Sequence, residues 1–301
     1  MSLLVTGTVG LDTVETPLGK AESALGGSAV YFSFGAAPYT RVRLVAVVGA
    51  DFPAEFRALL EAHNVDLRGL ETHAGHSTFR WSGKYTPDMN DRDTLDLQLN
   101  VVEEVTPQVP AAFADSEVVF LANTHPGLQQ ELLSAVRSPR LTVCDTMDHW
   151  IDSARDELLA TLGKVDGLII NDAEARQLTG RTNLIEAAEE VLKLGPGFVV
   201  VKKGEHGALL ATGDSLTAIP AYPTRNVKDP TGAGDSFAGG MLGYLATQSA
   251  LDDATLRRSL LHGTVAASFT IEDFSLGRVQ NLTRDEIDRR VAKFQQMLRI
   301  E

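Results

Sequence analysis

The chain has 301 residues, of which 44% are apolar and 22% are charged, and these values are ordinary for a globular protein. A chain of this length can bury a large core without disulfides or structural metal ions. With 27 Lys and Arg against 40 Asp and Glu, the formal net charge of −13 argues against a nucleic-acid-binding surface, which needs clustered cations.

Membrane, secreted and disulfide-rich classes are also disfavoured. No apolar run approaches the roughly 18 residues that a membrane span needs. The N-terminus lacks the basic segment, apolar segment and cleavage site of a signal peptide. Cys144 is the single cysteine, so neither an internal disulfide nor a multi-cysteine zinc site can form. We therefore expect a cytoplasmic protein that binds neither nucleic acid nor a membrane.

Short aliphatic runs recur along the chain, and each is followed by a turn and a helical pattern. Such runs are typical of strands that are covered on both faces. Their alternation with helices predicts one doubly wound α/β domain over residues 1–301, with a mostly parallel sheet and helices on both faces. The predicted strands are Leu3–Thr6, Leu44–Val48, Val118–Ala122, Leu141–Cys144, Leu168–Ile170 and Phe198–Val201. The predicted helices lie near residues 28–37, 53–63, 127–137, 153–162, 172–179, 184–194, 234–248 and 253–269, and a capping-box pattern at Thr283–Glu286 opens a final helix.

Residues 77–101 break this pattern, because apolar and polar residues alternate there. The aromatic residues from Phe79 to Tyr85 share one parity, and the leucines from Leu95 to Leu99 do the same. This alternation predicts a half-exposed antiparallel hairpin. Together with a segment from about residues 11–25, the hairpin is expected to form a small sheet that acts as a lid inserted within the domain. An edge extension of the main sheet and a dimer contact are the alternatives.

Residues 229–237, Asp-Pro-Thr-Gly-Ala-Gly-Asp-Ser-Phe, are the strongest chemical signal in the chain. Gly232, Ala233 and Gly234 stand at the start of a predicted helix, where free amides and the helix dipole can hold an anion. Asp235 lies in the same first turn, and a carboxylate there can accept the proton of a hydroxyl that attacks a phosphoryl group. A helix start with glycines for close packing is the alternative for Gly-Ala-Gly alone.

This run resembles the C-terminal signature of the PfkB (ribokinase-like) family of small-molecule kinases, although Asp229-Pro230-Thr231 stands in place of the usual Asp-Thr-Thr. The resemblance implies that Asp235 is the catalytic base and that the backbone from Gly232 to Asp235 forms the anion hole for the transferred phosphoryl group. It also implies ATP and Mg²⁺ as cofactors, and a monovalent cation such as K⁺ near Asp229 and Thr231.

The N-terminal part of the chain agrees with this resemblance in one motif and departs from it at one position. Gly26 and Gly27 resemble the family's Gly-Gly motif, which lets substrate hydroxyls approach the backbone, and Asp12 matches the aspartate that binds those hydroxyls. By itself, the glycine pair could be only a turn. Tyr31, a further candidate substrate ligand, stands where members such as ribokinase have an asparagine that holds a sugar or nucleoside hydroxyl. Because of this difference, the motif does not identify the substrate.

Two further motifs match the family in order and spacing. Asn171 and Glu174 match an Asn-x-x-Glu motif that acts on magnesium, mostly through water. Taken alone, the pair could equally be a strand-end cap and a surface carboxylate. The segment that begins at Lys202 resembles the family's nucleotide loop, and a late helix lines the adenine pocket in the family. The candidate nucleotide-binding residues are Lys202, Gly204, Gly207, Thr231, His262 and Ala266.

The sequence therefore predicts an ATP-dependent kinase that phosphorylates a hydroxyl of a sugar. A nucleoside is the first alternative acceptor, and a sugar phosphate, which needs a basic cluster, is the next. Arg80 and Asn100, on the charged face of the lid, are candidate substrate ligands, and Asp145 lies at a strand end on the expected side of the sheet. Two alternatives are not enzymes: a non-catalytic sensor that binds a sugar or a nucleotide, and a dimerisation module. A homodimer through the lid is also expected.

Overall fold

The computed structural model describes residues 1–299, and within them the chain forms one large and one small sheet. In the large sheet, all neighbouring strands in the run from β11 to β5 pair in parallel. β12 and β13 extend the sheet beyond β11 as antiparallel strands. Each strand that the sequence predicts is present in the parallel part. From edge to edge the strands are β13 (Leu216–Ile219), β12 (Ala208–Thr212), β11 (Phe198–Lys202), β10 (Gly167–Asn171), β9 (Leu141–Cys144), β8 (Val118–Leu121), β1 (Leu3–Thr6), β4 (Val42–Gly49) and β5 (Val65–His73).

The sequence analysis missed the three strands at the two edges, β5, β12 and β13. β5 contains the buried carboxylate Asp66, which accepts hydrogen bonds from Arg68 in the same strand, and such polar residues interrupt the aliphatic run used for prediction. β12 and β13 follow β11 as a hairpin, and the outer strand, β13, is half exposed. Edge strands carry polar residues because one side of them faces water.

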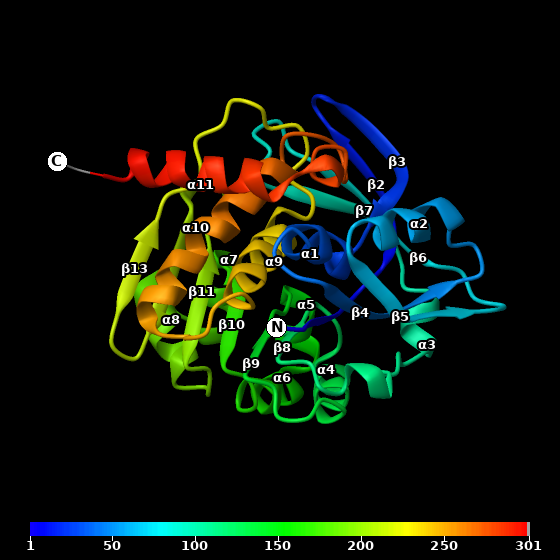
Figure 1. Ribbon diagram of the computed structural model, residues 1–301, viewed down its shortest axis with the longest axis horizontal. Coiled ribbons are helices and arrows are strands. Elements are labelled where there is room, and N and C mark those ends of the chain that lie inside the picture. The colour runs from blue at the N-terminus through cyan, green and yellow to red at the C-terminus, as the bar shows by residue number, and fades with distance from the viewer. Residues whose placement is uncertain (300–301) are drawn as a thin grey trace.

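Helices cover both faces of the large sheet (Figure 1). Leu3 and Val5 of β1 belong to one apolar core and Leu4 of the same strand belongs to the other, as expected for a strand covered on both faces. One layer contains α1 (Ser28–Ala36), α9 (Ala233–Leu245), α10 (Asp253–Thr270) and α11 (Arg284–Met297). The opposite layer contains α4 (Pro126–Ser134), α5 (Asp148–Ser153), α6 (Arg155–Leu162), α7 (Asp172–Thr179) and α8 (Leu184–Leu192). The remaining helical elements are α2 (Ala54–Ala62), the single turn α3 (Val101–Glu104) and the 3₁₀ turns η1 (Ala111–Phe113), η2 (Gly204–His206) and η3 (Val279–Asn281).

The structure contains one short helix, α5, that the sequence analysis did not predict. The helix expected near residues 153–162 corresponds to α6, and α5 precedes it as a separate short helix. Ala154 lies between them with φ −137° and ψ 40°, a conformation that does not continue a helix. The predicted doubly wound α/β fold class is otherwise confirmed.

The small sheet stands beside the large one, with β2 and β3 projecting at the upper right of Figure 1. Its strands are β3 (Gly19–Gly26), β2 (Gly10–Thr16), β6 (Phe79–Tyr85) and β7 (Arg92–Gln98), in that order. β2 pairs with β6 in parallel, and the two outer pairs are antiparallel. We call this four-stranded sheet the lid. The predicted small sheet of residues 11–25 and the hairpin is thus confirmed, whereas the parallel pairing of β2 with β6 was not predicted.

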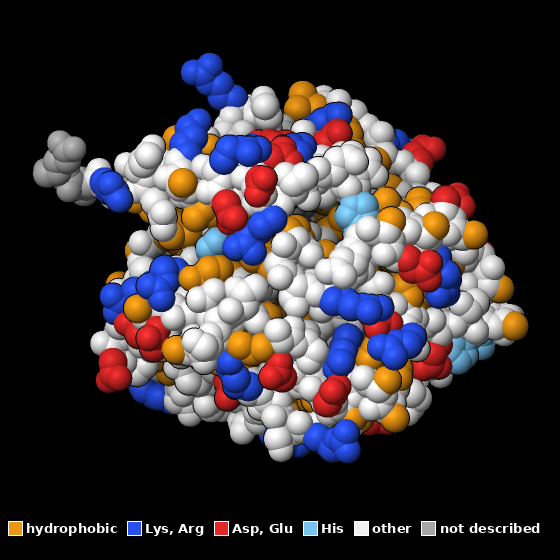
Figure 2. Space-filling model, viewed as in Figure 1, with side chains coloured by type: hydrophobic (Ala, Val, Ile, Leu, Met, Phe, Trp, Pro, Cys, Tyr) orange, Lys and Arg blue, Asp and Glu red, His pale blue; other side chains and the backbone are white. Residues whose placement is uncertain are grey.

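The outer surface carries charges of both signs. On the face shown in Figure 2, Lys and Arg side chains are interspersed with Asp and Glu. Among the helices of residues 1–299, none combines the length and the apolar composition needed to cross a membrane.

Candidate active site

The candidate site lies where three neighbouring strands of the large sheet end close to the start of α9. Asp145 directly follows β9, Asn171 ends β10 and Lys202 ends β11. Asn171 and Lys202 are register partners, so they lie side by side. Open α/β sheets bind ligands outside the carboxyl ends of their strands. The fold thus gathers at one edge residues that are far apart in the sequence.

The start of α9 requires glycine at position 232, and glycine at position 234 allows a close approach of Lys202. Gly232 has a left-handed φ of 72°, and a Cβ atom there would lie 2.1 Å from the ring of Tyr31. A Cβ atom on Gly234 would lie 2.9 Å from the Nζ atom of Lys202. These distances place the Tyr31 ring and the Lys202 ammonium group against the backbone of this turn, so the glycines are explained by close approach.

One backbone amide that was predicted to form the anion hole, that of Ala233, already has a hydrogen-bond partner. The Ala233 amide donates a hydrogen bond to the carbonyl oxygen of Pro230 at 3.1 Å. It is therefore used within the turn, and a part for the Ala233 amide in the anion hole stays a prediction. The amides of Gly234 and Asp235 also lie in the first turn, where helical amides have no partner within the helix. These two amides are the ones that can bind an anion.

Asp235 is the acidic residue of the first turn of α9, and its charge state is set by burial and by two cations. Burial raises the pKa of Asp235 to about 6, while the positive charges of Lys202 and Arg92 act to lower it. Burial likewise raises the pKa of Asp145, which the negative charge of Asp235 raises further. A carboxyl group with a pKa near 6 is ionised at neutral pH and still accepts a proton readily.

Asn171 and Glu174 form a helix cap as well as lying at the site. The side chain of Asn171 accepts a hydrogen bond from the Glu174 amide at 2.8 Å, and the Asn171 amide donates to Glu174 Oε2 at 2.8 Å. The cap that the sequence allowed as an alternative is thus confirmed. Burial raises the pKa of Glu174, and the charge of Lys202 opposes that shift. The carboxylate therefore lies within the electrostatic range of Lys202.

Asp12 links the lid to the start of α1. It is 4% exposed, and its Oδ2 atom accepts a hydrogen bond from the Gly27 amide at 3.2 Å. A Cβ atom on Gly26 would lie 1.9 Å from that carboxylate, and one on Gly27, where φ is 97°, would lie 2.4 Å from Thr8 O. The two glycines therefore allow β2 and β3 to reach the body closely. Burial raises the pKa of Asp12 to about 7, although the Gly27 hydrogen bond lowers it.

Asp229 joins the loop before α9 to the loop after α10. Its Oδ1 atom accepts from the Thr231 amide at 2.9 Å, and its Oδ2 atom accepts from the Ser275 amide at 3.1 Å. The Ser275 hydroxyl donates in turn to the carbonyl oxygen of Leu25 at 2.8 Å. Sequence reasoning missed Ser275, because no local motif marks it and its partners are distant in the chain.

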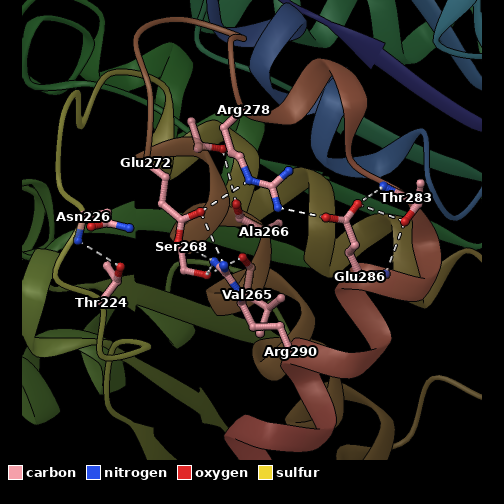
Figure 3. Close-up of polar contacts among 11 residues, drawn as sticks. Thr224, Asn226, Val265, Ala266, Ser268, Glu272, Arg278, Thr283, Glu286 and Arg290 are labelled. Atoms are coloured by element: carbon pink, nitrogen blue, oxygen red, sulfur yellow. Dashed lines mark hydrogen bonds and ion pairs between the residues drawn. The ribbon is translucent and has the colours of Figure 1, made fainter.

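Arginine–carboxylate pairs hold the loop that carries Ser275 (Figure 3). Arg290 of α11 lies 2.9 Å from Glu272, whose side chain is 13% exposed. Arg278 contacts both Glu272, at 3.5 Å, and Glu286, at 3.0 Å. The shared carboxylate of Glu272 ties the end of α10 to α11 and to the intervening loop. This network fixes the position from which Ser275 reaches Asp229.

The lid touches the body at the two ends of the site. The Tyr85 hydroxyl accepts a hydrogen bond from the Thr231 hydroxyl at 3.2 Å. Asn90, in the loop between β6 and β7, donates to Glu205 Oε1 at 3.2 Å. Glu205 belongs to η2, within the segment predicted as the nucleotide loop. The lid thus reaches from the anion-binding turn to that loop.

The charged residues of the lid predicted to bind substrate are used elsewhere. Arg80 forms an ion pair with Asp51 at 2.7 Å. Asn100 donates to the carbonyl oxygen of Thr78 at 2.9 Å, and the Thr78 hydroxyl donates to Asp51 at 2.7 Å. These contacts fix the base of the lid. Arg80 lies on the face of β6 opposite to the face shared with Asp12. Contact of Arg80 and Asn100 with the substrate stays a prediction.

The late helix does not bring its predicted nucleotide ligands to this site. The ring of His262 hydrogen bonds to the Tyr39 hydroxyl through Nδ1 at 2.9 Å and stacks on Tyr244 with 4.0 Å between ring centroids. Burial lowers the pKa of His262 to about 4, so the ring is neutral. Ala266 packs against Gly240 of α9. Both side chains pack against neighbouring helical residues, and contact of His262 and Ala266 with a nucleotide stays a prediction.

The predicted nucleotide loop follows Lys202 directly. Gly204 and Gly207 have φ values of 54° and 83°, and a Cβ atom on Gly207 would lie 2.0 Å from Ile219 O. The Lys203 amide donates to Gly207 O at 2.7 Å, which closes a tight turn between β11 and β12. Their contact with a nucleotide stays a prediction.

Comparison with known proteins shows the family of this chain. A model described as pfkB family carbohydrate kinase matches residues 22–281. The cytidine kinase of Thermococcus kodakarensis is 30% identical over 250 residues, covering 81% of this chain and 88% of that protein. The chain belongs to the pfkB carbohydrate kinase family. This pfkB-family protein is therefore a phosphotransferase with a hydroxyl group as acceptor.

Solved structures share the fold of this pfkB-family kinase at lower identity. The nucleoside kinase of Burkholderia thailandensis in complex with inosine has a TM-score of 0.79 at 19% identity, with 98% of each chain covered. A putative ribokinase II from E. coli in complex with ATP and Mg²⁺ has a TM-score of 0.80 at 17% identity, covering 97% of this chain and 99% of that one.

The charge of Lys202 predicts a measurable effect on pH dependence. Lys202→Met removes a cation that lowers the pKa of Asp235, so that pKa should rise above about 6. If Asp235 must be ionised to accept a proton, the acid limb of kcat/KM moves to higher pH, by about one pH unit. Lys203→Met is the matched control and should leave the midpoint in place. An unmoved midpoint in Lys202→Met would contradict the assignment.

Proposed function

We propose that this kinase transfers the γ-phosphoryl group of Mg²⁺-bound ATP to the hydroxymethyl group of a sugar, either free or as the ribose of a nucleoside. The single observation that carries this proposal is Asp235, a carboxyl group with a pKa of about 6 in the first turn of α9, with Lys202 beside that turn. A base of this pKa next to anion-binding amides suits attack by an alcohol on a phosphoryl group.

In this proposal, different residues of the chain orient the acceptor, accept its proton and stabilise the phosphoryl group. Asp12 accepts hydrogen bonds from sugar hydroxyls and orients the acceptor. As the acceptor oxygen forms its bond to phosphorus, its proton passes to a carboxylate oxygen of Asp235, and the bond from phosphorus to the leaving oxygen of ADP breaks. The Gly234 and Asp235 amides and the Lys202 ammonium group stabilise negative charge on the phosphoryl oxygens.

The residues at the strand ends fit a magnesium–nucleotide complex. The Oδ1 atom of Asp145 is buried with no hydrogen-bond partner in the described residues, and Glu174 supplies a second carboxylate nearby. Mg²⁺ is usually held by one or two carboxylates together with waters and substrate phosphates. Asp145, Asn171 and Glu174 would hold the ion, mainly through water, and the ion would supply charge neutralisation of the phosphates.

The turn from Lys202 to Gly207 is the proposed place of the nucleotide. It follows the strand end that carries Lys202, and the lid contacts it through Asn90 and Glu205. The E. coli relative of this fold was solved with ATP and Mg²⁺, which supports the choice of donor. Closure of the lid over this turn would exclude water, which otherwise competes with the acceptor.

Removing the proposed base should abolish turnover. Asp235→Asn keeps the shape of the side chain and loses the proton acceptor, so kcat should fall by about 10²–10⁴-fold. ADP release is measured with Mg-ATP and a panel of pentoses, hexoses, sugar phosphates and nucleosides. Asp214→Asn, in the exposed turn between β12 and β13, is the control and should keep full activity. Turnover that survives in Asp235→Asn would remove Asp235 as the base.

A monovalent cation near Asp229 and Thr231 also remains a proposal. Both carboxylate oxygens of Asp229 already accept backbone hydrogen bonds, so the backbone carbonyls of this loop are the ligands to expect. Potassium chloride should then raise kcat above the value in choline chloride at equal ionic strength. Equal rates in the two salts would argue against the cation.

A homodimer through the lid is the remaining proposal. β7 is an edge strand whose residues are all exposed, and Leu95 is 59% exposed. An open strand edge can pair with a second copy. Light scattering of the purified protein should then give twice the monomer mass of 32.4 kDa, and Leu95→Lys should lower it. A monomeric mass for the unaltered protein would reject this dimer.

A further inference from the structure

We propose that the inner face of the lid binds a flat nucleobase through Trp81, so that the acceptor of this kinase is a nucleoside. This inference rests on the proposed function and names the acceptor of the same site. Trp81 is then a specificity-determining residue; the sequence indicated only that aromatic residues of the lid suit a base, and the structure singles out Trp81 among them.

Strand register places Trp81 beside the residue that binds hydroxyls. Asp12 of β2 is the parallel register partner of Trp81 in β6, and Trp81 is the partner of Leu97 in β7. Partners in register project from the same face of a sheet, and neighbouring strands are about 4.8 Å apart. Asp12, Trp81 and Leu97 therefore form a row across one face of the lid.

This face is the one that looks toward the body of the protein. Asp12 reaches the Gly27 amide from it, and Tyr85, of the same parity as Trp81, reaches Thr231. Arg92 is the register partner of Tyr85, and its charge acts on Asp235 across the site. The row of Asp12, Trp81 and Leu97 thus faces the space in which an acceptor must lie.

The indole ring lies over Gly83 on this face. A Cβ atom on Gly83 would lie 2.3 Å from ring atoms of Trp81, so the ring covers the bare backbone of that glycine. The indole nitrogen donates to the Thr94 hydroxyl at 3.3 Å, which fixes the orientation of the ring. The guanidinium carbon of Arg92 lies 5.7 Å from the ring centroid. Because Arg92 lies over the Trp81 ring, a base would stack on this Arg92–Trp81 pair rather than on a bare indole face.

These groups suit a base better than a free sugar. Aromatic rings and guanidinium planes stack on nucleobases. In a nucleoside the base is attached next to the 2′-hydroxyl, so ribose hydroxyls held by Asp12 bring the base to a neighbouring strand of the lid. Leu97 is 51% exposed in that row and would be covered by such a ligand. A free pentose contains no apolar group that would cover Trp81 and Leu97.

A phosphorylated sugar is a poorer match for the same face. The lid cations Arg80 and Lys84 belong to the opposite parity, and each is paired, with Asp51 at 2.7 Å and with Glu15 at 2.6 Å. Arg92 is then the cation that the inner face offers. A sugar phosphate site needs several cations or amides around the phosphate group.

Steady-state kinetics test the role of Trp81. The unaltered enzyme should prefer cytidine, inosine or uridine to ribose by at least about 10-fold in kcat/KM, the scale of one base–aromatic stack. Trp81→Ala should lower that preference by a similar factor, mainly through a higher KM for the nucleoside, and Trp81→Phe should restore most of it. Ser82→Ala, the neighbouring residue on the outer face, is the matched control.

Fluorescence gives a second readout that needs no turnover. The chain has two tryptophans, so Trp150→Phe leaves Trp81 as the single indole emitter. Nucleoside added to this variant should change its emission in a saturable way, and ribose at the same concentration should not.

The outcomes separate this inference from the proposed function. Turnover of ribose equal to that of nucleosides, an unchanged preference in Trp81→Ala, or no emission change with any nucleoside would overturn the role of Trp81, and the kinase assignment would still stand. Absence of ADP release with every acceptor, in an enzyme that binds ATP, would instead count against the proposed function.

Discussion

The site depends on one electrostatic arrangement, a carboxyl group in the first turn of α9 with a lysine at the same turn. Burial raises the pKa of Asp235 to about 6, and the charge of Lys202 acts against a further rise. Without that cation the carboxyl group would be protonated more often near neutral pH and could not accept a proton. Gly234, which has no Cβ atom, leaves room for the lysine ammonium group beside the backbone of this turn.

The lid contributes to the same site through the register of its central strands. Parallel pairing of β2 with β6 puts Asp12 and Trp81 in one row, and the body contacts of Asp12 and Tyr85 turn that row inward. The residues on the opposite face of β6, which include Arg80, hold the lid against the body through the ion pair with Asp51. A single register thus separates residues that face the acceptor from residues that support the lid, since a shift by one residue would exchange the two faces.

The C-terminal helices act on the site from a distance. Glu272 binds Arg278 and Arg290, and this network holds the loop from which the Ser275 amide reaches Asp229. Asp229 in turn accepts a hydrogen bond from the Thr231 amide, just ahead of the anion-binding turn. Because these ion pairs are largely shielded from water, losing one partner would leave a poorly solvated charge, which is costly.

The sequence by itself determined the parallel core of the sheet, the anion-binding turn at Gly232–Asp235 and the Gly-Gly motif, since each is a short pattern of neighbouring residues. Only the tertiary structure decided which side chains these elements face. His262 lies in helix packing and Arg80 at the base of the lid, because their partners come from distant segments. The alternation in residues 77–101 showed two faces of a strand, but pairing with β2 selected the face of Trp81 as the inner one. Local patterns depend on the chain's own periodicity, whereas orientation depends on contacts between segments that meet only after folding.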